Sequence, residues 1–502
     1  METLILQGRL AALSQLAGRN LAVLIFCLLL TACAVTPLRS PADPNAARCL
    51  ALYELVDRAV AEHGYSPSSP ARIAGFPYLR VNRFLAGYRE QPLDSAQRAA
   101  WLKQLAELDR IARQIELASL PASVLAELTA RQAIATNLPD ALQSCSQQLQ
   151  ATDLADPERF TALQEHAVVP PDYLTWRQIV GLYPLSSLPI SFGVARWHQE
   201  TYRTFAQPLE TLPVQGRLQR FRPPEETGQF IAPDKLPQDA LGIPTPDTRQ
   251  LDSLFAVYAP VWEIDVSGDY DLPGTPFWQA DGKPGVNTIN PVVYRYPSYV
   301  RWRHQALLQL NYLIWFSERP AGGPLDILAG PLDGVIWRVT LNADGSPLLY
   351  DSIHACGCYQ QFFPSTALRL RPTALDLPEP PLVPQMAPMV SGGKRLVIRL
   401  GSGNHYIQRL YADVPTGSRY RWEDYRALYA VSYDGQKRSL FGPDGLVAGT
   451  ERSERWLLWP MGVPSPGAMR ERGRHATAFI GRRHFDDPDL LDTLFEPAEN
   501  KR

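Results

Sequence analysis

The stretch Tyr350–Tyr359 holds three side chains that can bind a metal or attack a substrate, namely His354, Cys356 and Cys358. Histidine and cysteine are common zinc ligands, and a cysteine beside a histidine base can act as a nucleophile. In a continuing strand all three would lie on one face, too far apart for a single metal ion to reach. Chelation therefore requires a turn, which Gly357 permits.

Three interpretations of this stretch are open. In the first, His354 with Cys356 or Cys358 binds a metal such as zinc, and the distant His405 completes the site. In the second, one cysteine is a nucleophile with His405 or His354 as its base, as in a thiol hydrolase or transferase. In the third, the pair is structural, and Cys356 and Cys358 form a tight disulfide or are simply buried.

The hairpin signal at Asn342–Gly345 suggests a partner for His354. If the flanking strands pair so that Val335 faces Ser352, then Asp333 lies opposite His354. A carboxylate beside an imidazole would fix its tautomer and raise its basicity. The candidate catalytic residues are therefore His354, Cys358, His405 and Asp333.

Weaker candidates lie elsewhere in the chain. One is an acidic run that comprises Glu263, Asp265, Asp269 and Asp271. It could bind a hard cation, or it could be an ordinary solvated loop. Glu318 and Arg319 follow an apolar run and could form an ion pair that lines a cleft, or a plain strand-end pair. His475 and His484 stand among arginines that could meet acidic lipid head groups or cell-wall polymers, or form a solvated face.

The composition and the missing motifs exclude several function classes. The formal net charge of −2 argues against nucleic acid, which demands a basic face. The chain has no glycine-rich phosphate loop, no His-Glu-x-x-His and no Gly-x-Ser-x-Gly sequence. The commonest signatures of nucleotide-binding proteins, zinc proteases and serine hydrolases are thus absent. With 45% hydrophobic and 20% charged residues, the chain is typical of a globular protein.

The N-terminus carries a processing signal. A helix that spans a membrane needs about 20 apolar residues, and the apolar run Leu21–Leu30 is shorter than that. The run fits the hydrophobic core of a signal peptide over 1–32. Its end, Leu30–Cys33, reads Leu-Thr-Ala-Cys and resembles the lipobox of bacterial lipoproteins. That resemblance implies acyl chains such as palmitate on Cys33, and Ala34 after it favours the outer membrane, facing the periplasm. Residues 33–45 are polar and Pro-rich and are predicted to be a tether that reaches about 40 Å.

The six cysteines can then be sorted by role. Cys27 leaves with the signal peptide, and Cys33 carries lipid. Four remain: Cys49, Cys145, Cys356 and Cys358. Disulfides persist in an oxidising compartment, and the first two of these lie on the apolar faces of predicted helices. We therefore predict a disulfide between Cys49 and Cys145.

Residue periodicity predicts the elements that position these side chains. Apolar residues at helical spacing indicate a helical domain over 46–205. A Pro-rich, irregular connection follows over 206–300, with a strand-like run at 253–266. In the β-rich domain over 301–502 we expect hairpins at 335–352 and 425–441, a strand pair within 394–414 and a surface connection at 371–390. Across 299–316 we expect a helix through Leu310 and then a strand from Tyr312.

The predicted fold class is α+β, with an N-terminal helical region stapled by a disulfide and a larger antiparallel β-rich region after it. We expect an envelope lipoprotein, held at the membrane by its lipid anchor, with a binding or assembly role toward a protein partner or an envelope polymer. The alternative is a metal- or thiol-dependent hydrolase with its site around His354, Cys358 and His405. Convergence of these three side chains in a concave pocket would favour the hydrolase.

Overall fold

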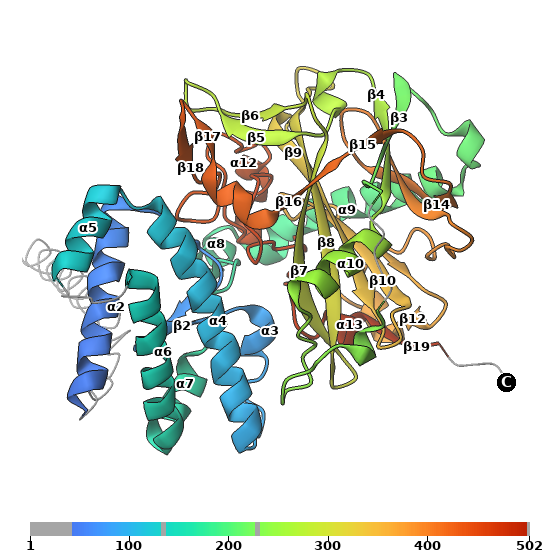
Figure 1. The fold of residues 1–502 in the computed structure, drawn as a ribbon. Helices are drawn as coiled ribbons and strands as arrows, with labels where there is room; N and C mark the ends of the chain where they lie inside the picture. Colours follow the sequence, from blue (N-terminus) through green and yellow to red (C-terminus); the bar gives the residue numbers. More distant parts are fainter. Residues whose placement is uncertain (1–42, 132–136, 226–230, 499–502) are drawn as a thin grey trace, which may run out of the picture. The chain divides into compact units, whose positions relative to one another are not determined.

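The computed structural model describes residues 43–131, 137–225 and 231–498 (Figure 1). The chain divides into two units, Met1–Ala47 and Arg48–Arg502. The predicted α+β class is confirmed, because a helical region with one disulfide precedes a larger set of mostly antiparallel and mixed sheets. The predicted signal peptide, the lipobox and the tether up to residue 42 lie outside the described residues.

The first region of the chain is mostly helical, as predicted, with one small hairpin of strands. Asp94 begins its longest helix with a capping box, in which Asp94 accepts from the Gln97 N–H and the Gln97 side chain accepts from the Asp94 N–H. The predicted disulfide between Cys49 and Cys145 joins two of its helices. The elements are α2 (Pro44–His63), β1 (Ala71–Ile73), β2 (Phe76–Val81), α3 (Arg83–Ala86), α4 (Ser95–Ser119), α5 (Ala122–Arg131), α6 (Leu138–Ala155) and α7 (Pro157–His166).

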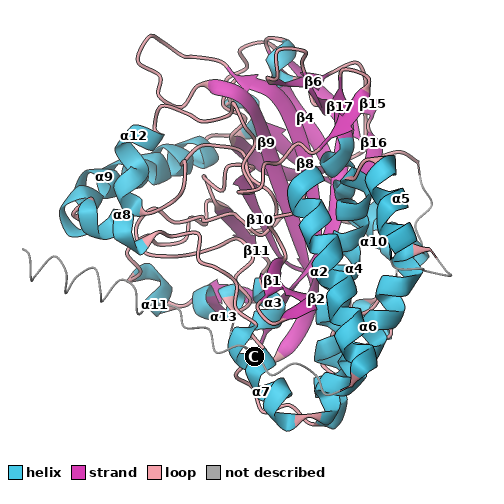
Figure 2. Cartoon of the chain, turned by 90° about the vertical axis from the view of Figure 1, so that its left-hand side faces the viewer, coloured by secondary structure: helices cyan, strands magenta, loops and turns pink. Residues whose placement is uncertain are grey.

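Two further helices lead from this region to the sheets, α8 (Thr175–Val180) and α9 (Tyr183–Ala206). Both pack on the distant segment formed by α12 (Arg455–Leu458) and the short 3-10 helix η5 (Trp459–Met461). Figure 2 shows α8, α9 and α12 together, well away from α4 and α6.

A six-stranded sheet is the centre of the second region, with the strand order β11-β10-β9-β8-β7-β16 (Figure 1). Its neighbours pair antiparallel except β16, which runs parallel to β7. The strands are β7 (Val292–Trp302), β8 (Gln305–Arg319), β9 (Gly330–Leu341), β10 (Pro347–His354), β11 (Gln361–Pro364) and β16 (Arg421–Asp424).

The helix predicted through Leu310 is wrong. Residues 299–316 belong to the β7–β8 hairpin, which turns at Arg303 and His304, both with positive φ. β8 is buried from Ala306 to Phe316 because its two faces enter separate apolar clusters. A strand covered on both faces is a continuous apolar run, which periodicity cannot distinguish from a buried helix.

A five-stranded sheet, β14-β13-β4-β3-β15, contributes to a large apolar core together with one face of the six-stranded sheet. The strand-like run predicted at 253–266 is only half a strand, since α10 (Thr248–Tyr258) occupies its beginning. Asp247 and Gln250 form a capping box that starts this helix. The sheet consists of β3 (Arg217–Arg222), β4 (Val261–Val266), β13 (Arg395–Leu400), β14 (Ile407–Asp413) and β15 (Ser418–Arg419).

Smaller elements complete the described chain. The predicted pair within 394–414 is confirmed as β13 and β14, whereas the predicted hairpin at 425–441 pairs only its inner residues, because Tyr425–Ala430 is a 3-10 helix. Asp434 and Gly435 at its turn both have positive φ, as a type I′ turn requires. The remaining elements are β5 (Thr275–Trp278), β6 (Pro284–Asn287), β17 (Val431–Tyr433), β18 (Gln436–Arg438), β12 (Leu368–Leu370), β19 (Phe495–Pro497), α11 (Pro372–Leu375) and α13 (Leu490–Leu494).

The predicted hairpin of β9 and β10 is confirmed, but its register differs from the prediction. Val335 faces His354 and not Ser352, because the turn is one residue longer and a bulge follows Pro347. The shift amounts to two residues, so every side chain keeps its predicted face of the sheet. Among the described helices, none combines the length and the hydropathy that crossing a membrane would need.

Candidate functional site

The stretch His354–Cys358 is the turn between β10 and β11. The His354 N–H donates to the Cys358 carbonyl at 3.0 Å, and the Gly357 N–H donates to the His354 carbonyl at 2.8 Å. Gly357 has a φ of +93°, and a Cβ there would lie 2.5 Å from the Ala476 carbonyl oxygen, so the position requires glycine. The chain thus reverses direction directly after His354. This is the turn that His354, Cys356 and Cys358 would need in order to approach one another.

The two predicted histidines share one buried carboxylate. His354 Nδ1 lies 3.2 Å from Asp333 Oδ1, and His405 Nδ1 lies 2.8 Å from Asp333 Oδ2. The predicted contact of Asp333 with His354 is therefore present, although the two residues are not opposite each other in the ladder. His405 comes from the loop between β13 and β14 and has a φ of 52°, a strained value that clusters at functional sites.

A second carboxylate, Asp271, closes the group on the other side of His405. His405 Nε2 lies 3.3 Å from Asp271 Oδ1, and the Asp271 carboxylate also accepts from the Ser402 hydroxyl and the Gly403 N–H. The imidazole stacks on the Phe316 ring with 3.8 Å between centroids and 2° between planes. His405 is thereby fixed in position and orientation.

Burial and neighbouring charges act in opposite directions on the pKa values of this group. Burial lowers the pKa of His405, but the Asp271 and Asp333 carboxylates outweigh it and raise the pKa above 6.5. Burial raises the pKa of Asp333, but His354, His405 and Arg452 hold it well below 3.8. For His354, burial prevails over the attraction of Asp333 and lowers the pKa. The carboxylates of Asp271 and Asp333 thus favour the charged form of His405, whereas burial favours the neutral form of His354.

Cys356 and Cys358 are buried free thiols, so of the structural alternatives the disulfide is wrong and simple burial holds. The Cys358 N–H lies 3.4 Å from the Cys356 sulfur. The thiol of Cys358 hydrogen-bonds to Cys356, which lowers the pKa of Cys356, and the same bond together with burial raises the pKa of Cys358. Among the described residues neither sulfur has a hydrogen bond to His354 or His405, so a thiol–imidazole dyad is not assembled.

The other predicted ligand sets are also dispersed. Across residues 43–131, 137–225 and 231–498, no three His, Cys, Asp or Glu side chains are arranged to hold a metal ion, and this includes the proposed set of His354, Cys356, Cys358 and His405. The acidic run separates too, since Glu263 pairs with Arg220 while Asp265 accepts from the Gln215 and Gly216 N–H groups.

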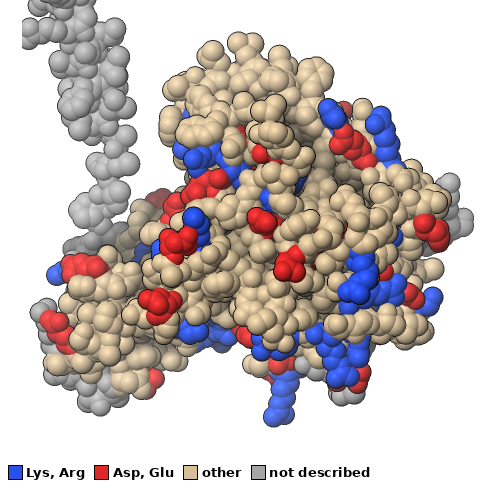
Figure 3. All heavy atoms as spheres, turned by 90° about the horizontal axis from the view of Figure 1, so that it is seen from above, with Lys and Arg blue, Asp and Glu red and all other residues tan. Residues whose placement is uncertain are grey.

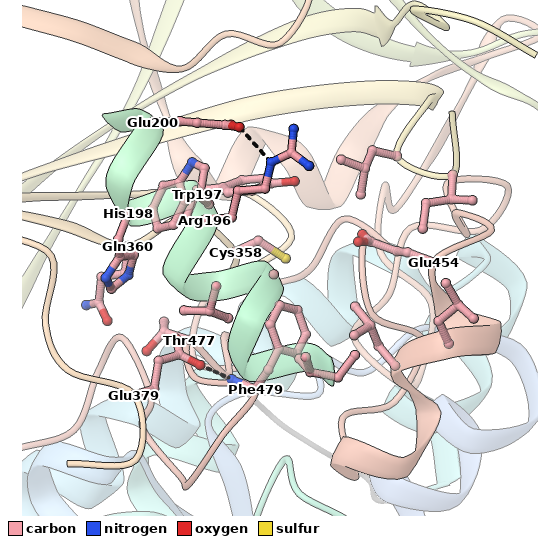
Figure 4. A pocket seen from close by; sticks show the side chains of 18 of the residues that line it. Arg196, Trp197, His198, Glu200, Cys358, Gln360, Glu379, Glu454, Thr477 and Phe479 are labelled. Carbon is pink, nitrogen blue, oxygen red and sulfur yellow. Dashed lines mark hydrogen bonds and ion pairs between the residues drawn. The ribbon is translucent and has the colours of Figure 1, made fainter. Parts of the chain in front are cut away.

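A cavity of about 490 Å³ lies beside this group, between α9, the His354–Cys358 turn and the segment around α12 (Figure 4). Its apolar lining includes Ile190, Val194, Leu457, Leu458 and Phe479. Its polar lining includes Arg319, Cys358, Tyr359, Tyr406 and Glu454, together with Arg196, Glu200, Glu379 and Arg483. A volume of this size suits a small molecule.

Tyr359 and Tyr406 connect the cavity to the histidine group. Their rings lie 4.6 Å apart, and each meets the His354 ring edge-on, at 5.0 Å and 5.6 Å between centroids. Burial raises the pKa of both phenols, so both keep their protons at neutral pH. The Asp333–His354 pair thus supports the two tyrosines that line the cavity.

Arg319 is the most unusual residue of the cavity. Its side chain is 8% exposed, and its one described hydrogen bond goes to the Tyr406 hydroxyl at 3.2 Å. Among the described residues, no carboxylate lies within 4.0 Å of the guanidinium. The ion pair predicted with Glu318 is wrong, because neighbours in a strand point to opposite faces and Glu318 is exposed. Of these two residues, Arg319 alone lines the cavity.

Glu454 faces the same cavity without a cation within 4.0 Å among the described residues. Burial raises its pKa to about 6, against the attraction of Arg452, Arg319 and Arg470. Its charge therefore changes near neutral pH.

Several site residues were not found from the sequence. Tyr359, Tyr406 and the α9 wall carry no local signature, because a cavity is formed by segments far apart in the chain. The sequence places Asp271 in an acidic run that could bind a cation or be a solvated loop, and it does not indicate the contact of Asp271 with His405. Comparison of the chain with protein-family models, curated proteins and solved structures yields no significant match. The chemistry of the site therefore has to be inferred from its geometry.

Proposed function

We propose that this protein is a lipid-anchored envelope lipoprotein that binds an anionic amphiphile, a molecule with a carboxylate or phosphate head and an apolar body, in the cavity beside α9. The observation that carries the proposal is Arg319, a buried cation at the cavity wall with no carboxylate partner among the described residues. Burying an unpaired charge is costly, and an anionic ligand would supply the missing partner.

The neighbours of Arg319 fit the recognition of an anion. The guanidinium lies over the rings of Tyr406 and Tyr359, at 5.2 Å and 5.9 Å from their centroids. These contacts orient the guanidinium while leaving donors free, and arginine binds carboxylate and phosphate through paired donors. The protonated phenols add further donors at the same end of the cavity.

The apolar part of the cavity lining fits the apolar body of such a ligand. Ile190 and Val194 of α9 line it together with Leu457, Leu458 and Phe479. Apolar walls with a few convergent polar groups are the usual composition of a ligand site. An anionic head at Arg319 would leave the body of the ligand against these side chains.

The envelope location is supported by the lipobox-like Leu30–Cys33 and by the disulfide between Cys49 and Cys145. Disulfides are typical of oxidising compartments and rare in the bacterial cytosol. A lipid anchor at Cys33 would keep the binding site near the membrane, where amphiphiles are concentrated.

Titration calorimetry with three probes of equal chain length tests the ligand class: dodecanoate, dodecanol and dodecyltrimethylammonium. We expect dodecanoate to bind most tightly, and Arg319→Gln to weaken it by about 10- to 100-fold, as loss of hydrogen bonds to a charged group implies. The exposed Arg249→Gln serves as the matched control and should bind like the native protein. Equal affinity for the three probes, or no effect of Arg319→Gln, would refute the proposal.

A second candidate function, a thiol-dependent hydrolase, is favoured by the position of Cys358 at the cavity wall. Its raised pKa disfavours the thiolate that such chemistry needs. Ester hydrolysis that disappears in Cys358→Ala, with dodecanoate binding retained, would identify this activity.

A further inference from the structure

A large apolar surface lies on the outside of α8, α9 and α12. Nine bulky apolar side chains there expose between 56% and 75% of their area. We call this set the α9 surface, and it comprises Trp176, Ile179, Val180, Leu182, Leu185, Leu188, Phe192, Trp456 and Leu457. Single exposed apolar residues are ordinary, whereas a contiguous group of this size marks an interaction site.

Local contacts hold the three helices together. The Leu174 N–H donates to the Gly462 carbonyl at 2.8 Å, and Gln178 Nε2 donates to the Met461 carbonyl at 3.1 Å. Gly181 ends α8 so close to Pro460 that a Cβ there would lie 2.5 Å from the Pro460 Cβ. Because η5 follows α12 directly, these bonds place α8 beside α12, and the exposed side chains form one surface.

Helix α9 has two apolar sides. Leu185, Leu188 and Phe192 follow one another at spacings of three and four residues and face outward. Ile190 and Val194 lie on a different side of the helix and line the cavity. α9 therefore presents apolar side chains both to the cavity and to the α9 surface, and Leu457 of α12 belongs to the edge that the two share.

In the part of this surface that α8 and α9 form, the charges have one sign. No acidic residue occurs between Asp172 and Glu200. Arg177 lies over the Trp176 ring at 5.4 Å, and Arg455 lies over the Trp456 ring at 4.9 Å. In Figure 3 a lobe with almost no red or blue atoms occupies the side of the molecule where Figure 2 places these helices.

We propose that the α9 surface docks on an anionic phospholipid membrane. Leucine and phenylalanine on one helix side, tryptophan at the margin and arginine nearby form the pattern of helices that lie in the plane of a membrane interface. Arginines complement the phosphates of anionic lipids. The predicted tether reaches about 40 Å, so an anchored chain would remain within a short distance of the lipid.

This inference does not depend on the ligand of the cavity. It adds that the helix beside the cavity lies against the membrane.

The test uses the full chain purified from membranes and reconstituted in phosphatidylcholine vesicles, with or without phosphatidylglycerol, whose acyl chains carry bromine. Bromine quenches only those tryptophans that enter the acyl layer. Of the 11 tryptophans, Trp176 and Trp456 are the two that expose more than half of their area. We expect quenching that is stronger with phosphatidylglycerol and that is mostly lost in the double variant Trp176→Phe with Trp456→Phe.

A charge-insertion pair provides the control. Leu185→Asp with Phe192→Asp should abolish the quenching, whereas Ile289→Asp with Met389→Asp, two exposed apolar residues outside the α9 surface, should not. Circular dichroism confirms that each variant is folded. Quenching that is absent, or unchanged in Leu185→Asp with Phe192→Asp, contradicts the proposal. So does a dimer in sedimentation that this pair dissociates, because the surface would then bind a second copy.

Discussion

His405 Nδ1 lies 2.8 Å from Asp333 Oδ2, while the other oxygen of the same carboxylate lies 3.2 Å from His354 Nδ1. One fully buried aspartate thus orients two imidazoles, from the end of β10 and from the loop after β13. Because His354 supports Tyr359 and Tyr406, Asp333 controls the shape of the cavity without lining it.

Replacing this carboxylate should destabilise the fold. Asp333→Asn removes a buried charge that faces His405 and Arg452, and breaking such a buried pair typically costs about 3–5 kcal/mol. Urea unfolding measures the free energy of unfolding. Asp376→Asn, at an exposed position, is the control and should change it by less than about 0.5 kcal/mol. An unchanged midpoint for Asp333→Asn would show that the group contributes nothing to stability.

The pH dependence of stability should contain a component from His405. Its pKa in the folded protein lies above the ordinary value of 6.5, so its stabilising effect is complete below pH 6.5 and is lost as pH rises through the folded pKa. His405→Asn removes this titration. The difference in unfolding free energy between native protein and variant should therefore be largest in acid and decline above pH 6.5, and a constant difference would contradict the assignment.

Arg319 should affect binding more than folding. Arg319→Met keeps the apolar part of the side chain and removes a buried charge without a carboxylate partner, so the free energy of unfolding should hold or rise by about 1 kcal/mol. Dodecanoate binding, measured by calorimetry, should be lost. A loss of stability as large as that of Asp333→Asn would instead assign Arg319 a structural role.

Binding of an anionic ligand should weaken as pH rises. Glu454 faces the same cavity with a pKa of about 6, so above that pH it presents a negative charge to the ligand. We expect the anionic ligand to bind more tightly at about pH 5 than at about pH 7. Dodecyl sulfate is measured in parallel with dodecanoate, because its head group stays charged over this pH range. Glu454→Gln should remove the dependence, and a dependence that persists would point to another group.

The disulfide between Cys49 and Cys145 should stabilise the helical region. It spans a sequence separation of 96, for which the chain-entropy model gives about 4–5 kcal/mol. Cys49→Ser with Cys145→Ser should lower the unfolding free energy measured in urea by a similar amount. The same measurement with Cys356→Ser is the comparison, because that thiol is free.

How much of the fold was predictable depended on whether a residue's partners are local. The turn of the hairpin predicted within 425–441 and the helical faces of Cys49 and Cys145 are set by neighbours within a few positions, and both are present in the structure. The sequence predicts a helix through Leu310, where the structure has the first part of β8. Burial on both faces of β8 removes the alternation of polar and apolar residues that marks a strand.

For the site, the sequence by itself determined that His354 and Asp333 share a sheet face, because a shift of two residues leaves side-chain alternation unchanged. Only the tertiary structure decided that His405 joins them and that the two thiols have no hydrogen bond to either imidazole among the described residues. It also decided that Arg319 lines a cavity and does not form an ion pair with Glu318. These outcomes depend on segments separated by long stretches of chain. Packing brings such segments together, and no local spacing specifies which of them will meet.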